Sequence, residues 1–248
     1  MKKYALSFLA TLVLVGCGGE SDSSDGMGPI TKPEPITNSS VCYNNSLYAV
    51  GAELVQEYTQ TLDGVEEDNV TIRQKVNRLV SYGGYSDVLE VQNTDELGNI
   101  TLSYIQADDA LKSLRTLLVV DGDVEYTYEP SGTLQDFDLD VGEIREYPTV
   151  TINMNGKESS TVESSIKYVK SQSVRVPAGE FNTCLMEIRM ELTNWDGTIV
   201  NAVLQQNVGI GNGLVIKEEM ETVLSTGERV LTASDLVEGS LNGNIISP

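Results

Sequence analysis

The sequence contains no histidine. This absence excludes serine–histidine–aspartate and cysteine–histidine catalytic groups, and it excludes zinc, copper and haem sites that use an imidazole ligand. Histidine is also the commonest general base in enzymes. We therefore expect a protein that is not an enzyme and has no cofactor, and we assign no catalytic and no metal-binding residue.

Basic side chains are scarce as well. The chain has 16 Lys and Arg against 37 Asp and Glu, which gives a formal net charge of −21. Such a surface repels the phosphates of nucleic acids and anionic lipid headgroups, so we expect no nucleic-acid partner. Apolar residues still make up 40% of the sequence, so the excess of acid indicates a solvated surface and not a disordered chain.

The apolar run near the N-terminus, residues 5–15, is too short to span a bilayer comfortably. It follows the basic pair Lys2 and Lys3 and ends in Leu-Val-Gly-Cys, with the cysteine at Cys17. This order is typical of a secretory signal peptide, which we place at residues 1–16.

The Leu-Val-Gly-Cys ending resembles the lipobox of bacterial lipoproteins. The resemblance implies cleavage before Cys17, a diacylglycerol on its sulfur, and acylation of the new amino terminus by a chain such as palmitate. Several chains, at about 0.8 kcal/mol per buried methylene, would anchor the protein stably in a membrane. Gly18 and Gly19 follow the cysteine instead of aspartate, which in Gram-negative lipoproteins implies the outer membrane. We therefore expect a lipid-anchored envelope protein at the outer membrane, facing the periplasm; an ordinary signal peptide is the alternative.

Beyond the signal, two regions differ in composition. Residues 17–45 hold the lipidated N-terminus and a stretch rich in Ser, Asp, Gly, Pro and Asn, which predicts a flexible tether. From 46 to 248 the apolar residues alternate with polar ones, as in half-buried antiparallel strands, and frequent turn signals indicate about ten to twelve strands. We predict an all-β domain with one large curved antiparallel sheet or an open β-barrel, analogous to lipoprotein carriers; a two-sheet β-sandwich is the alternative.

One segment departs from the alternation. Residues 107–118 place Leu111, Leu114 and Leu118 at helical spacing behind Asp108 or Asp109. The segment predicts a short helix as much as a strand.

Two further patterns resemble ligand-binding motifs but each lacks part of the motif. Gly209, Gly211 and Gly213 precede another alternating segment and not the helix that a phosphate-binding loop needs, so they indicate a bulge or a close backbone crossing. Several aspartates alternate in a way that could hold calcium, but they lack the EF-hand order. These aspartates are Asp121, Asp123, Asp136, Asp138 and Asp140.

A Pro-Ala-Gly sequence at 177–179 separates two alternating stretches. Pro177 fixes φ and Gly179 tolerates a positive φ, which predicts a tight reversal between two strands. With the Gly-rich segment after it, this stretch resembles the V-x-V-P-A-G-x-F and G-x-G-x-V-K pattern of uncharacterised bacterial lipoproteins and periplasmic proteins, including DUF3108-type domains. Residues 139–147 are similar to the L-x-V-G-x-x-W strand that precedes that pattern. The resemblance covers residues 134–222 and implies an envelope protein without assigning a function.

Only Cys42 and Cys184 remain as thiols once Cys17 is acylated. An oxidising periplasm favours a disulfide between them. Cys184 shares the apolar face of its strand, however, so two separate thiols, one of them buried, are the alternative.

The apolar face of the predicted sheet carries more large side chains than a thin core needs. Those we predict to face a ligand are Tyr168, Met186, Met190 and Met220. The sequence therefore favours a non-catalytic binding module for an apolar or lipidic ligand. The alternative is an envelope scaffold or protein-interaction module that uses its acidic exterior and takes no small ligand.

Overall fold

The computed structural model describes residues 36–248, and alternating residues form strands over most of them. The predicted signal peptide and Cys17 lie outside the described residues. The 3-10 helices are η1 (Ser39–Cys42) and η2 (Asn45–Tyr48). The strands are β1 (Glu53–Leu62), β2 (Val65–Tyr82), β3 (Tyr85–Thr94), β4 (Ile100–Asp108), β5 (Ser113–Asp121), β6 (Val124–Glu129), β7 (Thr133–Asp136), β8 (Ile144–Glu146), β9 (Val150–Met154), β10 (Lys157–Val176), β11 (Gly179–Asn194), β12 (Ile199–Gly209), β13 (Val215–Leu224), β14 (Arg229–Leu241) and β15 (Asn244–Ile245).

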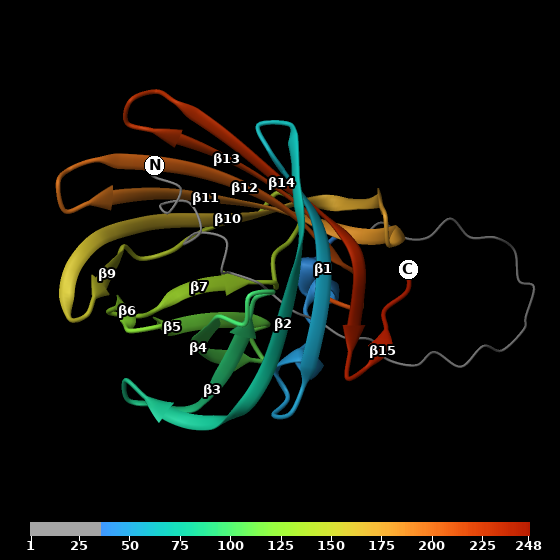
Figure 1. The fold of residues 1–248 in the computed structure, drawn as a ribbon, viewed down its shortest axis with the longest axis horizontal. Coiled ribbons are helices and arrows are strands. Elements are labelled where there is room, and N and C mark those ends of the chain that lie inside the picture. The colour runs from blue at the N-terminus through green and yellow to red at the C-terminus, as the bar shows by residue number, and fades with distance from the viewer. Residues whose placement is uncertain (1–35) are drawn as a thin grey trace, which may run out of the picture.

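All 15 strands belong to one antiparallel sheet. The main path runs β1 to β6, then β9 to β15, while β7 pairs with β5 and β8 pairs with β10. Because β1 also pairs with β14, from Leu54 opposite Leu241 to Leu62 opposite Thr232, the sheet closes into a ring (Figure 1). The predicted single curved sheet is confirmed, and the two-sheet sandwich does not form.

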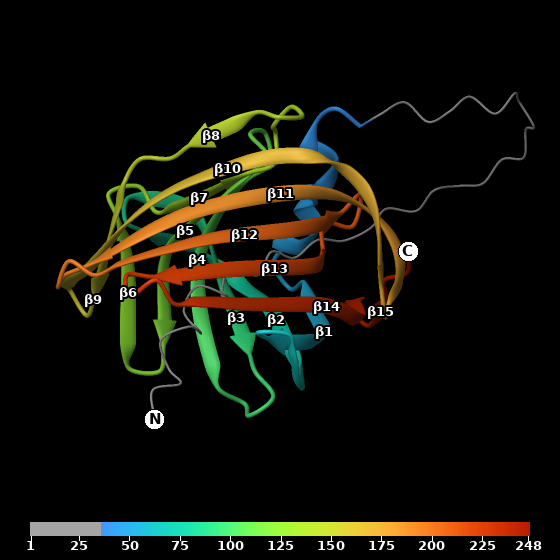
Figure 2. The ribbon, with the colours of Figure 1, turned by 90° about the horizontal axis from the view of Figure 1, so that it is seen from above.

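The long strands bend because their pairing contains bulges. The β10–β11 register shifts between Tyr168 and Lys170, and β1 has a shift on each of its two sides. A bulge adds one residue to one strand, which increases local twist. Figure 2 shows β10 and β11 arching along one side of the ring.

The structure has more strands than the turn signals indicate. The additional ones are short, since β7 has 4 residues, β8 has 3 and β15 has 2. A period of two residues is not detectable over so few positions.

Of the two alternatives for residues 107–118, strands form and the short helix does not. β4 ends at Asp108, a turn follows, and β5 begins at Ser113. Leu111 lies in this turn and is 63% exposed, while Leu114 and Leu118 are buried on β5. The Asp108 carboxylate accepts the Leu111 N–H at 2.9 Å, so the predicted helix cap instead stabilises the turn.

The reversal predicted at Pro-Ala-Gly joins β10 to β11, where Gly179 has a φ of 136°. The three glycines after residue 208 lie at the β12–β13 turn, next to a shift in the register of these strands. Both segments are backbone features of hairpins.

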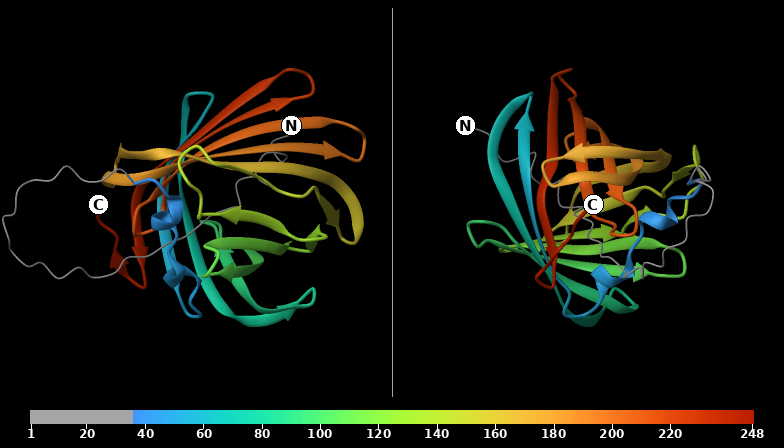
Figure 3. Two further views of the ribbon diagram at one scale, coloured as in Figure 1. Left: turned by 180° about the vertical axis from the view of Figure 1, so that it is seen from behind. Right: turned by 90° about the vertical axis from the view of Figure 1, so that its right-hand side faces the viewer.

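Residues 36–48 cross one end of the ring and are part of the fold (Figure 3). Cys42 packs with a buried cluster that includes Met186 and Val208, whereas Leu47 packs with a second cluster that includes Leu54 and Val76. The folded region therefore begins before residue 46, within the range expected to be tether. In the part of the chain that the structure describes, no helix has the length and hydrophobicity needed to cross a membrane.

Candidate functional site

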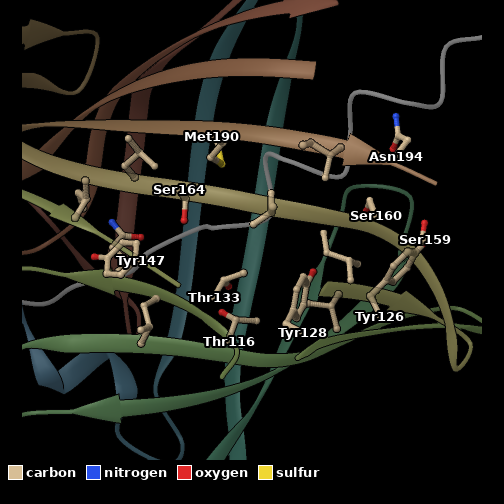
Figure 4. Close-up of a pocket in the computed structure, with 18 residues that line it drawn as sticks. Thr116, Tyr126, Tyr128, Thr133, Tyr147, Ser159, Ser160, Ser164, Met190 and Asn194 are labelled. Carbon is tan, nitrogen blue, oxygen red and sulfur yellow. The ribbon is translucent and has the colours of Figure 1, made fainter. Parts of the chain in front are cut away.

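A cavity of about 250 Å³ lies inside the ring, against β5, β6, β7, β9, β10 and β11 (Figure 4). Inward-facing residues at alternate positions form its wall, as on β10 and β11. The lining residues are Thr116, Val119, Tyr126, Tyr128, Thr133, Leu134, Gln135, Tyr147, Ile152, Ser159, Ser160, Val162, Ser164, Ile166, Ile188, Met190, Leu192 and Asn194.

The cavity extends from the buried core toward the hairpin turns at one end of the ring. Ile166 and Met190 line it and also belong to the core cluster around the Cys42 segment. At the outer end of the cavity, Ser159 and Asn194 are partly exposed and lie near the β9–β10 and β11–β12 turns. A ligand therefore has an apolar inner wall and a polar outer rim available to it.

Among the described residues that line the cavity, none is Asp, Glu, Lys or Arg. Burial raises the pKa of Tyr128 to about 12. Burial, together with the nearby Asp136 carboxylate, also raises the pKa of Tyr147 above its ordinary value. Both hydroxyls are therefore neutral at physiological pH, and the wall offers hydrogen bonds without charge.

One polar side chain of the wall is almost completely buried. Gln135 is 3% exposed, and both of its amide atoms, Nε2 and Oε1, are enclosed without a hydrogen-bond partner. The next residue, Asp136, is fixed by two contacts: its N–H donates to the Tyr147 hydroxyl at 3.0 Å, and its carboxylate pairs with Arg145 at 3.1 Å.

The four residues predicted to face a ligand divide between the cavity and the core. Met190 lines the cavity. Tyr168, Met186 and Met220 are buried in the core cluster, and the Tyr168 hydroxyl donates to the Ile36 carbonyl at 3.2 Å. All four side chains are buried, but only Met190 lines the cavity.

Most of the wall was not singled out from the sequence. The alternation on β10 puts Ser160, Val162 and Ser164 on the inner face, so this part had a detectable signal. Gln135 had none, because it stands in a strand of 4 residues whose position depends on pairing with β5.

The structure joins Cys42 to Cys184 by a disulfide with a Cα–Cα distance of 6.3 Å. This bond ties the N-terminal segment to β11. The same segment is held by the Ser39 hydroxyl, which donates to the Phe137 carbonyl at 2.6 Å, and by Asn44, whose amide donates to the Gly211 carbonyl at 2.7 Å.

Three of the alternating aspartates, Asp136, Asp138 and Asp140, have protein partners. The Asn38 amide donates to Asp138 at 3.0 Å and to Asp140 at 3.1 Å, and Asp136 pairs with Arg145. Over residues 36–248 no group of three or more Cys, Asp or Glu side chains is arranged to hold a metal ion.

A second hollow, of about 550 Å³, lies against β8, β10, β11 and β12 and shares Tyr147, Ser164 and Met190 with the cavity. Its lining includes Glu163 and Glu191, which are exposed and charged. It is therefore a solvated surface feature, and the uncharged cavity is the better candidate for a binding site.

No family model matches this sequence, and no curated protein matches it either. The resemblance to DUF3108-type domains thus stays a prediction.

Several solved structures resemble the fold. One is a candidate exported protein with a YmcC-like fold from Bacteroides fragilis NCTC 9343, with a TM-score of 0.48, 13% identity, and coverage of 77% of this chain and 96% of that chain. A candidate lipoprotein from Parabacteroides distasonis ATCC 8503 has a TM-score of 0.41 and 12% identity, covering 77% and 96%. The hypothetical lipoprotein YmcC from Escherichia coli (K12) has a TM-score of 0.39 and 9% identity, covering 76% and 87%. At these low scores no conclusion about function follows from the similarity.

Proposed function

We propose that this chain is a lipid-anchored protein of the bacterial cell envelope whose ring of strands binds a small, largely apolar ligand without catalysing a reaction. The observation that carries this proposal is the uncharged cavity of about 250 Å³ inside the ring. Protein interiors normally leave few voids larger than a water molecule, so a cavity of this size indicates space for an occupant.

Apolar burial would provide the affinity. Val119, Ile152, Val162 and Leu192 line the cavity from β5, β9, β10 and β11. Each square ångström of apolar surface removed from water contributes roughly 25 cal/mol. The closed ring holds these side chains on paired strands, so little ordering of the protein opposes binding.

The predicted anchor explains how such a ligand would reach the cavity. Lipidation at Cys17 would keep the ring next to a membrane, where apolar molecules are concentrated. The acidic surface repels anionic headgroups, so attachment would depend on the acyl chains and not on electrostatic attraction.

The test uses the full chain carrying Cys17→Ser, purified without detergent, and the neutral fluorescent probe N-phenyl-naphthylamine. We expect saturable binding of the probe and, by native mass spectrometry, a bound molecule that the probe displaces. Ile152→Trp fills the cavity and should weaken probe binding by about ten-fold or more.

Thr151→Trp is the matched control for this change. Successive residues of a strand point to opposite faces, so the new indole would lie outside the cavity and binding should persist. If the chain carrying only Cys17→Ser neither binds the probe nor carries a bound molecule, the result would instead favour the scaffold or protein-interaction role.

A further inference from the structure

Two neighbouring hairpins at the outer end of the cavity present apolar side chains to solvent. Trp195, in the β11–β12 turn, is the only tryptophan of the sequence and is 83% exposed. Met154 at the end of β9 and Ile199 at the start of β12 are exposed as well. We call these three side chains the tip residues. Because an indole has a large apolar area, the exposure of Trp195 leaves much of that area in water.

The two hairpins are joined, and the backbone of the β11–β12 turn is fixed. The Trp195 N–H donates to the Ser159 carbonyl at 3.0 Å, which connects this turn to β10. Within the turn, the Asn194 N–H donates to the Thr198 carbonyl at 2.9 Å, and the Thr198 N–H donates to the Asp196 carboxylate at 2.9 Å. Figure 2 shows the β9–β10 and β11–β12 turns side by side at one end of the ring. The indole therefore projects from an ordered turn.

The same hairpins form the outer rim of the cavity. Ser159 and Asn194 line the cavity, and Trp195 is bonded to the first and follows the second in sequence. Met154 shares the parity of Ile152 on β9, and Ile152 also lines the cavity. Any surface that covers the tip residues would therefore lie next to the outer end of the cavity.

The charge of the hairpin ends limits what can cover them. Lys157 contributes one positive charge, whereas Glu158 and Asp196 contribute two negative charges, so the formal charge here is −1. The whole chain has a net charge of −21. An anionic surface would be repelled. A bilayer of zwitterionic lipids is neutral, and its interface with water is where tryptophan side chains are enriched in membrane proteins.

The shape of the hairpin ends favours a bilayer over a second protein. A stable protein interface buries about 800 Å² on each partner, which requires a broad continuous patch. The tip residues are three side chains on two narrow turns. Such a protrusion fits between lipid headgroups, where the apolar side chains lose their contact with water.

The predicted anchor at Cys17 permits this contact. The Tyr168 hydroxyl donates to the Ile36 carbonyl, which places the start of the described chain beside β10. At about 3.3 Å per residue, about 36 Å of β10 separates Tyr168 from Lys157. The chain between Cys17 and Ile36 would span up to about 60 Å when extended. The tip residues are therefore within reach of the membrane that would hold the anchor.

We propose that the tip residues enter the interfacial region of a zwitterionic lipid bilayer and bring the outer end of the cavity to the membrane surface. Three side chains bury less apolar area than the acyl chains of an anchor, so the contact is reversible and does not retain the protein without Cys17. The inference goes beyond the proposed function, because it assigns the membrane-facing side of the ring and does not depend on what the cavity holds.

The test uses the full chain carrying Cys17→Ser, purified without detergent, and vesicles of phosphatidylcholine. Because Trp195 is the only tryptophan, indole emission reports this turn alone. We expect the emission to shift to shorter wavelength when vesicles are added, and brominated phosphatidylcholine to quench it. Including phosphatidylglycerol in the vesicles should weaken binding at low ionic strength, since the acidic surface is repelled by this lipid.

Two variants remove tip residues. Trp195→Ser should lower the partition coefficient for phosphatidylcholine vesicles, measured by co-sedimentation, by about ten-fold, and Met154→Ser should lower it by about three-fold. Leu97→Ser is the matched control, because Leu97 is 87% exposed in the β3–β4 turn, which lies apart from the two hairpin ends (Figure 2). It should leave the partition coefficient unchanged. Circular dichroism checks that each variant is folded.

The outcomes separate this inference from the proposed function. An emission spectrum that vesicles do not change, tighter binding to phosphatidylglycerol, or equal losses in Trp195→Ser and Leu97→Ser would overturn the inference and leave the cavity's role intact. Short-wavelength emission without lipid, together with a dimer in size-exclusion chromatography, would overturn it in favour of a second copy of the chain. Absence of binding to N-phenyl-naphthylamine, with vesicle binding retained, would overturn the proposed function alone.

Discussion

At the scale of the residue, one partly buried carboxylic acid, Glu218, lies outside the cavity lining. Glu218 on β13 accepts a hydrogen bond from the Gln206 amide at 2.7 Å. Burial raises the pKa of Glu218 above its ordinary value of 4.5, and the bond from Gln206 lowers it only in part. The folded protein therefore binds this proton more tightly than the unfolded chain does.

This shift has a consequence for stability that depends on pH. Where the folded pKa is raised, the contribution to stability is complete below the unfolded value and is lost as the pH rises through the folded value. We expect Glu218→Gln, which keeps an acceptor for Gln206, to increase the free energy of unfolding at pH 8 more than at pH 5. Denaturant unfolding at the two values measures the difference.

Glu219→Gln provides the control, since Glu219 is exposed on the same strand and pairs with Lys217 at the surface. A surface pair contributes about 0 to 1 kcal/mol, so this variant should change stability little at either pH. An identical response of the two variants would show that burial of Glu218 has no special effect.

Parity along a strand was enough to predict which residues face inward, but not what each one contacts. Met186 and Met190 share a face of β11, yet only Met190 reaches the cavity. The residues opposite them on the neighbouring strands differ: Met186 lies opposite Tyr168 and Gln206, whereas Met190 lies opposite the smaller Ser164 and Ala202.

At the scale of the element, residues 36–48 have a larger role than their composition indicates. Ser and Asn are typical of a tether, but here Asn38 and Asn44 cap the two 3-10 helices by accepting the N–H groups of Ser40 and Ser46. The disulfide from Cys42 to Cys184 then fixes the segment across the ring.

Removing that disulfide should destabilise the whole ring. The bond joins residues 142 apart in sequence, and closing a loop of that length lowers the entropy of the unfolded chain enough to stabilise the fold by about 4 to 5 kcal/mol. We expect the double variant Cys42→Ala and Cys184→Ala to lose most of this amount in denaturant unfolding. Wild-type protein treated with reductant should match it, and a loss below about 1 kcal/mol would contradict the stabilising role.

The hairpin at 107–118 shows why element type was ambiguous there. Of the three leucines at helical spacing, only Leu111 lies in the turn, where it is exposed. Leu114 and Leu118 are buried on β5 and pair with Ala107 and Tyr104 of β4. Pairing of β4 with β5 outweighed the local preference for a helix, because it satisfies backbone groups on both sides of the turn.

At the scale of the whole molecule, the proposed placement depends on one residue outside the ring. Lipidation of Cys17 would hold a strongly acidic domain at a membrane that its surface repels. We expect Cys17→Ser to move the protein from the membrane fraction to the soluble fraction of the cell envelope, as measured by fractionation and immunoblotting. Ser225→Ala, a change at an exposed turn residue, is the control and should remain with the membrane. Retention of Cys17→Ser there would contradict anchoring by this residue.

The sequence by itself determined the all-β class, the buried face of the long strands and the Pro-Ala-Gly reversal, since each follows from neighbouring residues and a period of two. It left one curved sheet, an open barrel and a two-sheet sandwich as alternatives. Closure of the ring, the cavity and the unpaired amide of Gln135 were decided only by the tertiary structure. Closure pairs Leu54 with Leu241 across almost the whole described chain, and six separate strands surround the cavity. Such features depend on which distant segments come together and how they fill the space between them, and local alternation contains neither.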